Sequence, residues 1–268
     1  HTAWVTLQEN NAIAKINIQA KKVTHIFPLG FKSYNKNDNA IDPSDKDGGI
    51  FLNKWNVKGM YQPDAIGIYE RGGIPYLFTA NEGDARDYSG FSEVERVKDI
   101  VLDPAAFPDA SISDDDKLGR LNITTTLGDD GRDGDYENLF SFGARSFSVW
   151  QGNTGEILYD SKNELEKLCI DAGLYDDGRS DDKGVEPEGI AIGKVGARHI
   201  AFVGMERADA LAIYDISDPL HPRFLKVLAT GDAPEGITFI PAIESPVHKS
   251  LVVVSSENDG VIKIYRTN

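Results

Sequence analysis

The chain has 268 residues, with 28 basic and 43 acidic side chains and a formal charge of −15. This acid excess argues against nucleic acid as a partner and against an anionic membrane surface, because both need clustered Lys and Arg. Hydrophobic residues make up 40% of the chain, enough for a buried core, and no apolar run approaches the roughly 18 residues of a membrane span.

The predicted elements are mostly short β-strands, separated by Gly, Asn, Asp and Pro. The runs typical of strands are residues 4–7, 13–18, 65–69, 76–80, 139–142, 147–150, 200–203, 210–216, 237–240, 251–254 and 261–265. Helical spacing is found at residues 163–170, where Ser161 is a plausible N-cap, and a second short helix is predicted at residues 92–101. Long polar segments predict insertions near residues 32–58, 84–138 and 160–184. Because the chain opens inside a predicted strand, we expect a fragment or a processed product.

One hairpin pattern recurs along the chain. An apolar strand is followed by a glutamate, a tight polar turn and a return strand, and the glutamates are Glu9, Glu82, Glu206 and Glu257. A second element, Pro-acid-small-Ile, precedes three of these hairpins, with Asp64, Glu188 and Glu235 as its acids. The repeat therefore predicts a unit of three to four antiparallel strands.

Such a unit is typical of a β-propeller blade. We expect an all-β fold, a single propeller domain or partial propeller over residues 1–268, with four to five blades. The alternative is a β-sandwich whose hairpins resemble one another by chance.

The repeated acids are the first candidates for chemistry. In a propeller they project from equivalent places on successive blades, and converging carboxylates need a cation, a basic side chain or raised pKa values. Carboxylate oxygens are also the ligands that Ca²⁺ prefers. The alternative is that each acid braces a turn within its own blade.

Two further segments are rich in carboxylates. Residues 81–88 add Asp84 and Asp87 to Glu82, a density that suits Ca²⁺. Residues 129–137 have the composition of a calcium loop, but Gly131 and Phe140 stand where the EF-hand pattern requires ligands, which leaves a solvated turn as the alternative.

Basic residues stand close to these acids in the sequence. Lys183 lies in the segment that leads to Glu186 and Glu188, a mixture that suits either a metal and phosphate site or a self-neutralising loop. Arg145 is flanked by small and aromatic residues, so a buried charge there needs a partner, for which the repeated carboxylates are the candidates. The sequence contains no G-x-S-x-G, P-loop or H-E-x-x-H motif, and its five histidines are scattered.

Four segments together resemble the choice-of-anchor I family. They are residues 59–66 (GMYQPDAI), 79–88 (TANEGDARDY), 140–150 (FSFGARSFSVW) and 179–189 (RSDDKGVEPEG). Bacterial members are often labelled alkaline phosphatase, and animal relatives are mesenchyme-specific cell surface glycoproteins associated with biomineralisation. The resemblance implies a secreted or cell-surface β-propeller of about seven blades, of which this chain resembles the carboxy-terminal part. The loops at residues 168–179 and 225–234 look shorter than is common in the family.

This resemblance implies an amino-terminal part that supplies the remaining blades, or self-association in its place, since open blades leave unpaired strand edges. Three hypotheses on function follow. The first is a Ca²⁺-binding module for surface attachment or for contact with mineral or matrix. The second is a metal-dependent phosphoesterase, similar to the calcium-dependent β-propeller phytases. The third is a purely structural propeller.

The residues assigned to these hypotheses fall into two sets. Those expected to hold metal are Asp64, Glu82, Asp84, Asp87, Glu186, Glu188 and Glu235. For the phosphoesterase, the catalytic or phosphate-binding candidates are Arg145, Lys183 and Glu188.

Overall fold

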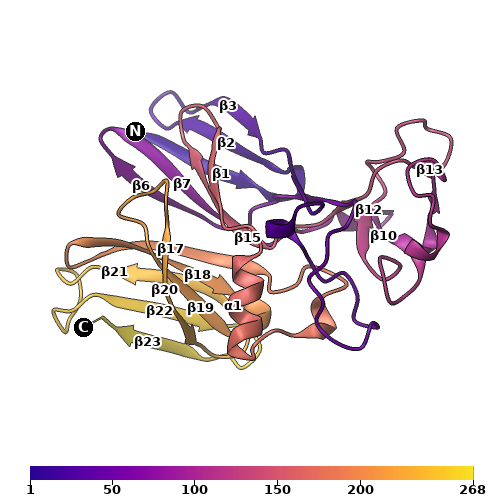
Figure 1. Cartoon of the computed structure of the whole chain (residues 1–268). Helices are drawn as coiled ribbons and strands as arrows, with labels where there is room; N and C mark the ends of the chain where they lie inside the picture. The colour runs from indigo at the N-terminus through magenta and orange to yellow at the C-terminus, as the bar shows by residue number, and fades with distance from the viewer. Residues whose placement is uncertain (268) are drawn as a thin grey trace.

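Residues 1–267 are described by the computed structural model, which shows an all-β protein with one α-helix among them (Figure 1). Most strands lie in four antiparallel sheets that follow one another along the chain. The first sheet contains β1 (Thr2–Leu7), β2 (Ala12–Asn17) and β3 (Lys22–Pro28). The second has the order β16-β15-β7-β6 and is built from β6 (Ile66–Arg71), β7 (Ile74–Asn81), β15 (Ser146–Gln151) and β16 (Ile157–Asp160).

The third and fourth sheets follow the chain order without a crossover. The third contains β17 (Pro187–Val195), β18 (Arg198–Met205), β19 (Ala210–Asp215) and β20 (Arg223–Ala229). The fourth contains β21 (Pro234–Ile240), β22 (Leu251–Ser256) and β23 (Ile262–Arg266). Within residues 1–267 the strands do not close into a barrel or a ring.

The long polar segments lie outside these four sheets, and β10, β12 and β13 gather to one side of them in Figure 1. A fifth sheet has the order β10-β12-β14-β5-β4, from β4 (Phe31–Ser33), β5 (Lys58–Met60), β10 (Val94–Arg96), β12 (Asn122–Thr124) and β14 (Phe140–Ser141). Two short pairs accompany it: β8 (Asp87–Tyr88) with β9 (Phe91–Ser92), and β11 (Val101–Leu102) with β13 (Asp135–Tyr136). Single 3₁₀ turns occur at Gln8–Asn10, Asn37–Asn39, Val97–Asp99, Ala110–Ser113, Asp177–Arg179 and Glu206–Ala208.

The predicted hairpin repeat is confirmed in the strand order. Each repeated glutamate follows a matching strand: Glu9 follows β1, Glu82 follows β7, Glu206 follows β18 and Glu257 follows β22. The return strands are β2, β15, β19 and β23, and β15 returns only after the insertion. In the four-strand unit, β3, β16 and β20 take the fourth, outer position. The first position is taken by β6, β17 and β21.

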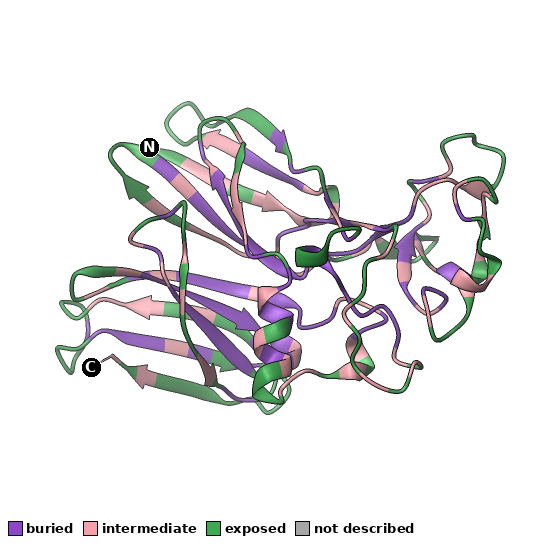
Figure 2. Cartoon of the chain, in the orientation of Figure 1, coloured by how far each residue is buried: buried purple, intermediate pink, exposed green. Residues whose placement is uncertain are grey.

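The largest core lies between the second and third sheets. Phe78 and Phe147 from the second sheet pack with Val203 and Tyr214 from the third, and the Phe147 and Tyr214 rings are 4.6 Å apart. Figure 2 shows this burial along the central strands, whereas β3 and β23 are largely exposed. Aromatic and β-branched side chains suit these half-buried pleated surfaces, so the local propensities and the packing agree.

The helix predictions are confirmed in one case and wrong in the other. Helix α1 spans Glu164–Ala172, but the Ser161 hydroxyl accepts from the Phe147 amide, 3.0 Å away, and does not cap the helix. Residues 92–101 form β10 and a 3₁₀ turn, because pairing with β12 overrides their weak helical spacing. No helix within residues 1–267 is both long enough and apolar enough to cross a membrane.

Candidate functional site

The repeat brings several predicted acids together where the second and third sheets meet. Carboxylate oxygens of Glu82, Glu186 and Glu206 lie within 4.8 Å of one another. Glu82 follows β7, Glu186 immediately precedes β17, and Glu206 follows β18, so strand ends place all three. We call these acids, with Asp64, Glu188 and the bases Arg179, Lys183 and Arg207, the Glu186 cluster.

Glu186 is fully buried and surrounded by bases. Its Oε1 accepts a hydrogen bond from Arg179 Nε at 2.9 Å and lies 3.4 Å from Arg207 Nε. Lys183 Nζ lies 3.2 Å from the other oxygen, Oε2, which is buried and has no hydrogen-bond partner within residues 1–267. A buried carboxylate needs such compensation, so the three bases account for its charge.

Glu82 and Lys183 form a second pair in the Glu186 cluster. Lys183 Nζ contacts Glu82 Oε1, and Gln8 Nε2 donates to Glu82 Oε2 at 2.8 Å. Burial raises the pKa of Glu82 to about 7 despite Lys183. Burial also opposes the charged form of Lys183, yet Glu82 and Glu186 raise the pKa of the lysine above its usual value.

The remaining acids of the Glu186 cluster hold their protons more tightly than usual. Burial, and then contact with Glu206, raises the pKa of Glu188 to about 9. Burial also raises the pKa of Glu206 and of Asp64, and the neighbouring Glu235 adds to the effect on Asp64. The cluster therefore contains more carboxyl groups than its bases neutralise.

The backbone at Glu186 is unusual. Its φ is +48°, a region that non-glycine residues seldom adopt, and its carbonyl accepts from the Glu206 amide at 2.9 Å. Such a conformation costs a non-glycine residue on the order of 1–3 kcal/mol and persists only where the surrounding contacts offset that cost.

The other predicted metal residues lie at the margin of the Glu186 cluster. Asp84 and Asp87 are exposed and line a cleft of about 240 Å³ together with Arg179 and Lys183. Glu235 is exposed at the start of β21. The structure thus brings Asp64, Glu82, Glu186 and Glu188 together and leaves these three at the edge.

Arg145 is fully buried and belongs to another set of contacts than those of the Glu186 cluster. Its guanidinium is 3.1 Å from Glu166 of α1 and donates to the carbonyls of Asp42 (2.9 Å), Ser180 (2.6 Å) and Asp182 (3.2 Å). We had expected the repeated carboxylates as its partner, and Glu166 takes that place instead. Sequence reasoning missed Glu166. It lies on the buried side of α1 together with Leu165 and Cys169, and that apolar side of the helix is the signal that could have identified it.

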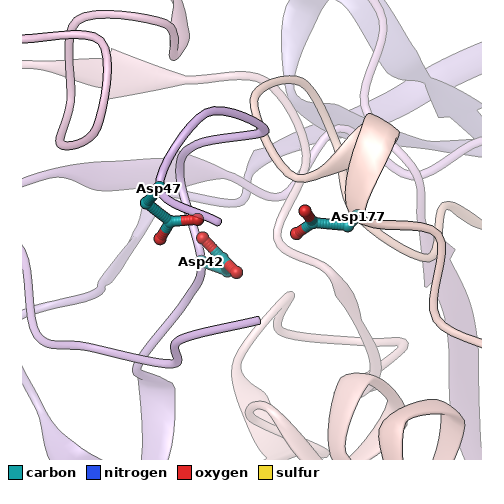
Figure 3. A group of neighbouring side chains, drawn as sticks. All are labelled: Asp42, Asp47 and Asp177. Carbon is teal, nitrogen blue, oxygen red and sulfur yellow. The ribbon is translucent and has the colours of Figure 1, made fainter. Parts of the chain in front are cut away.

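A second group of carboxylates was missed by sequence reasoning. Asp42 and Asp47 from one loop meet Asp177 from another, with one oxygen of each within 4.8 Å of the others (Figure 3). We call these three residues the Asp42 group. The dense acids and paired glycines of residues 42–49 were the available signal.

The Asp42 group differs from the Glu186 cluster in its charge balance. Asp42 is fully buried and accepts only from the amides of Ser44 (3.3 Å) and Phe51 (2.8 Å). Burial raises the pKa of Asp42 to about 7, and Asp47 and Asp177 add to that rise. Asp177 Oδ1 is buried without a hydrogen-bond partner, and within residues 1–267 no basic side chain forms an ion pair with any of the three acids.

The loop at residues 129–137 uses two of its carboxylates in hydrogen bonds to its own amides. Asp129 accepts from the amides of Asp133 and Gly134, and Glu137 accepts from those of Asp130 and Gly131. These bonds close a polar turn, and Asp135 and Glu137 also meet Asp103, with one oxygen of each within 4.8 Å of the others.

Comparison with known proteins adds two relatives. The chain is 31% identical over 189 residues to Gigasin-3a of Magallana gigas, covering 58% of this chain and 66% of that protein. It is 26% identical over 237 residues to the mesenchyme-specific cell surface glycoprotein of Strongylocentrotus purpuratus, covering 72% of this chain and 30% of that protein. The chain thus spans less than two thirds of either relative.

Two solved structures are similar to the chain at low scores. Hydrazine synthase of Kuenenia stuttgartiensis aligns over 99% of this chain and 80% of its own, at 13% identity, with a TM-score of 0.32. A functionally unknown protein from Desulfotomaculum acetoxidans aligns over 99% and 78%, at 11% identity, with a TM-score of 0.24. These scores establish no shared fold.

The sequence model of a protein family, described as the choice-of-anchor I domain, matches residues 1–219, which is more than half of the chain. The segments from which we inferred the resemblance all fall inside this match. The chain belongs to the choice-of-anchor I domain family.

Proposed function

We propose that this protein acts outside the cell or on its surface, as a Ca²⁺-binding module in attachment or in contact with mineral or matrix. Membership of the choice-of-anchor I domain family and a relative named as a cell surface glycoprotein support the location. The formal charge of −15 suits a partner that carries divalent cations.

We further propose that the four sheets are blades of a propeller. First-position strands of neighbouring sheets approach closely: a Cβ on Gly67 of β6 would lie 2.7 Å from Ile192 Cγ1 of β17. Likewise a Cβ on Gly193 of β17 would lie 2.3 Å from the Phe239 ring of β21. Glycine permits this stacking of first strands, which is the relation between neighbouring blades.

A disulfide would test that packing. A Cβ built on Gly67 lies 3.8 Å from Ile192 Cβ, the mean separation in disulfides. We expect a Gly67→Cys, Ile192→Cys variant to form this bond on mild oxidation, because the sole natural thiol, Cys169, is buried. The matched control pairs Gly67→Cys with Lys194→Cys, one pleat further along β17. Equal cross-linking in both variants, or none in the first, would contradict the stacking.

The observation that carries the calcium proposal is the Asp42 group. Three carboxylates from two loops converge without a base, and one of them has a buried oxygen with no donor. Ca²⁺ takes six to eight oxygen ligands, so the carbonyls and waters around this group would complete its shell. The Glu186 cluster is the weaker candidate, because Arg179, Lys183 and Arg207 already form ion pairs with Glu186 at its centre.

Calcium titration of single variants separates these sites. We expect the wild type to bind Ca²⁺ by calorimetry, the Asp177→Asn variant to lose that binding, and the Glu82→Gln variant to keep it. Thermal melts without Ca²⁺ establish that both variants are folded. Loss of binding in Glu82→Gln alone would move the site to the Glu186 cluster, and no binding by the folded wild type would contradict the proposal.

The second candidate function is a metal-dependent phosphoesterase. It is favoured by the cleft in which Arg179 and Lys183 stand beside Asp84 and Asp87, since both bases could contact a phosphate there. In this mechanism, Ca²⁺ bound by Asp84 and Asp87 would activate a water molecule, and Glu188 would accept or donate a proton. Release of phosphate from p-nitrophenyl phosphate with Ca²⁺, lost in Lys183→Met at unchanged folding, would support it. Equal release by wild type and variant would count against it.

A further inference from the structure

The chain contains three Asp-Pro peptide bonds, which join Asp42 to Pro43, Asp103 to Pro104 and Asp218 to Pro219. An aspartate carboxylate can attack the carbonyl carbon of its own residue, because that attack closes a five-membered ring. Proline has no N–H, so the competing attack of the next amide nitrogen on the carboxyl group is blocked at these bonds. Asp-Pro bonds therefore break more readily than other peptide bonds, and the surrounding protein decides how readily.

The three bonds differ in burial. Asp42 and Pro43 are both buried, whereas Asp103 is half-buried and Asp218 is exposed. The bond between Asp42 and Pro43 is therefore the one whose chemistry the protein interior controls most.

The Asp42 carboxylate is held in place by the backbone. Its Oδ1 accepts from the Ser44 amide at 3.3 Å, and its Oδ2 accepts from the Phe51 amide at 2.8 Å. Both donors follow Asp42 in the chain, so they hold the carboxylate on the side where the bond to Pro43 lies. Within residues 1–267 no basic side chain forms an ion pair with it, so its charge remains available for attack.

The carbonyl of the same bond is activated by a buried cation. Arg145 Nη1 donates to the Asp42 carbonyl oxygen at 2.9 Å, and Arg145 is fully buried. A donor at this distance stabilises the oxyanion that forms when the carbonyl carbon is attacked, and it does so most strongly where water is excluded. The carbonyls of Asp103 and Asp218 instead accept from backbone amides, at 2.8 and 3.2 Å.

We propose that the protein cleaves its own chain between Asp42 and Pro43. The Asp42 carboxylate attacks the Asp42 carbonyl carbon, and Arg145 stabilises the oxyanion. The C–N bond to Pro43 breaks as the nitrogen takes a proton from water, which leaves a cyclic anhydride at Asp42. The remaining hydroxide opens the anhydride, so one water molecule is consumed and Asp42 ends with two carboxyl groups.

The two parts of the cleaved chain remain joined by the fold. Strand β4 belongs to the first part and pairs with β5 of the second. Lys32 of β4 donates to the Ala144 carbonyl at 2.9 Å and lies 2.9 Å from the Asp160 carboxylate, both in the second part. Cleavage therefore produces one folded molecule with two new chain ends beside the Asp42 group.

Intact-mass measurement of the full chain tests the proposal. The purified protein is kept for several days at neutral pH in chelator, so the result does not depend on Ca²⁺ at the Asp42 group. We expect fragments 1–42 and 43–268, whose masses together exceed that of the chain by one water molecule. This bond should break at least about tenfold faster than those after Asp103 and Asp218, and it should lose that advantage in urea, which removes Arg145 from the carbonyl.

Cleavage in water labelled with heavy oxygen identifies the anhydride. Direct attack of water on the peptide bond places the label in the new α-carboxyl group of Asp42. Opening of the anhydride places part of the label in the side-chain carboxyl group. We expect fragmentation of the peptide that ends at Asp42 to show label in the side chain.

Two variants test the named residues. Asp42→Asn has nearly the same size but a weaker nucleophile, and Arg145→Lys keeps the charge but loses the planar fork. We expect each to slow cleavage at least about tenfold. Asp103→Asn is the matched control and should be cleaved at the wild-type rate. Thermal melts establish which variants are folded, and the comparison of wild type with and without urea does not depend on them.

Four outcomes would overturn the proposal. The folded wild type could yield no fragment 43–268, or its three Asp-Pro bonds could break at equal rates. The folded Asp42→Asn variant could be cleaved as fast as the wild type. The label could be confined to the α-carboxyl group, which would mean that water attacks the bond directly.

Discussion

Three acids of the Glu186 cluster and the three acids of the Asp42 group lie equally close together, but their charges are balanced differently. In both, three acidic oxygens lie within 4.8 Å of one another. Around Glu186, bases from three positions lie within ion-pair distance. Around Asp42, backbone amides are the donors and the acids are left to repel one another. Proximity of acids alone is therefore a poor guide to a metal site, and the balance of charge is a better one.

The largest effect is expected from removing Glu186, the buried acid that three bases share. Glu186→Ala leaves Arg179, Lys183 and Arg207 without their shared carboxylate, so we expect a loss of about 3–5 kcal/mol in the free energy of unfolding. Urea denaturation measures it, with Asp87→Ala on the exposed β8 as the control. A loss below about 1 kcal/mol would show that the other acid partners of the bases, Asp182, Glu82 and Glu206, are enough to compensate them.

The next effect comes from adding Ca²⁺ to the uncompensated group. At free Ca²⁺ about 100 times the dissociation constant, binding to the folded state alone adds about 2.7 kcal/mol of stability. We expect this gain in the wild type and in Glu82→Gln, and its absence in Asp177→Asn. A gain in Asp177→Asn equal to that of the wild type would place the ion elsewhere.

The dependence of folding stability on pH is a further test of the Glu186 cluster. Glu82 binds its proton more tightly in the folded chain, with a pKa of about 7 against an ordinary 4.5. Its contribution to stability is therefore complete below pH 4.5 and falls by on the order of 1–3 kcal/mol as pH rises through 7. Urea denaturation at several pH values measures this fall, and Glu82→Gln should flatten it. An unchanged profile in that variant would assign the fall to other acids.

The smallest effect is expected from relieving repulsion in the Asp42 group. Without Ca²⁺, Asp177→Asn removes one of three neighbouring negative charges and should stabilise the chain by about 0.5 kcal/mol. Thermal melts in chelator measure this change, with Asp176→Asn as the neighbouring control. Destabilisation of about 2 kcal/mol would mean that the Asp177 carboxylate has a structural partner after all.

Local patterns predicted most of the strands and the repeat, because alternation and turn residues act over a few positions. The repeat predicted Glu82 and Glu206 at equivalent ends of the second strand and Glu188 at the start of a first strand, whereas Glu186 was a candidate only from the mixed-charge segment that precedes β17. The Asp42 group could not be predicted in this way, because Asp42 and Asp177 belong to different insertions with no shared pattern. Glu166 escaped notice because a charged residue on a short helix is normally assigned to solvent.

Arg145 has a consequence for how the molecule opens. One guanidinium joins α1 through Glu166, the loop of Asp42, and the segment of Ser180 and Asp182. Releasing any one of these segments would leave a buried charge short of a partner, so they should open as one cooperative unit. Amide hydrogen exchange would then show a single opening free energy for the helix and both loops. The three carboxylates of the Asp42 group would separate in that same opening step.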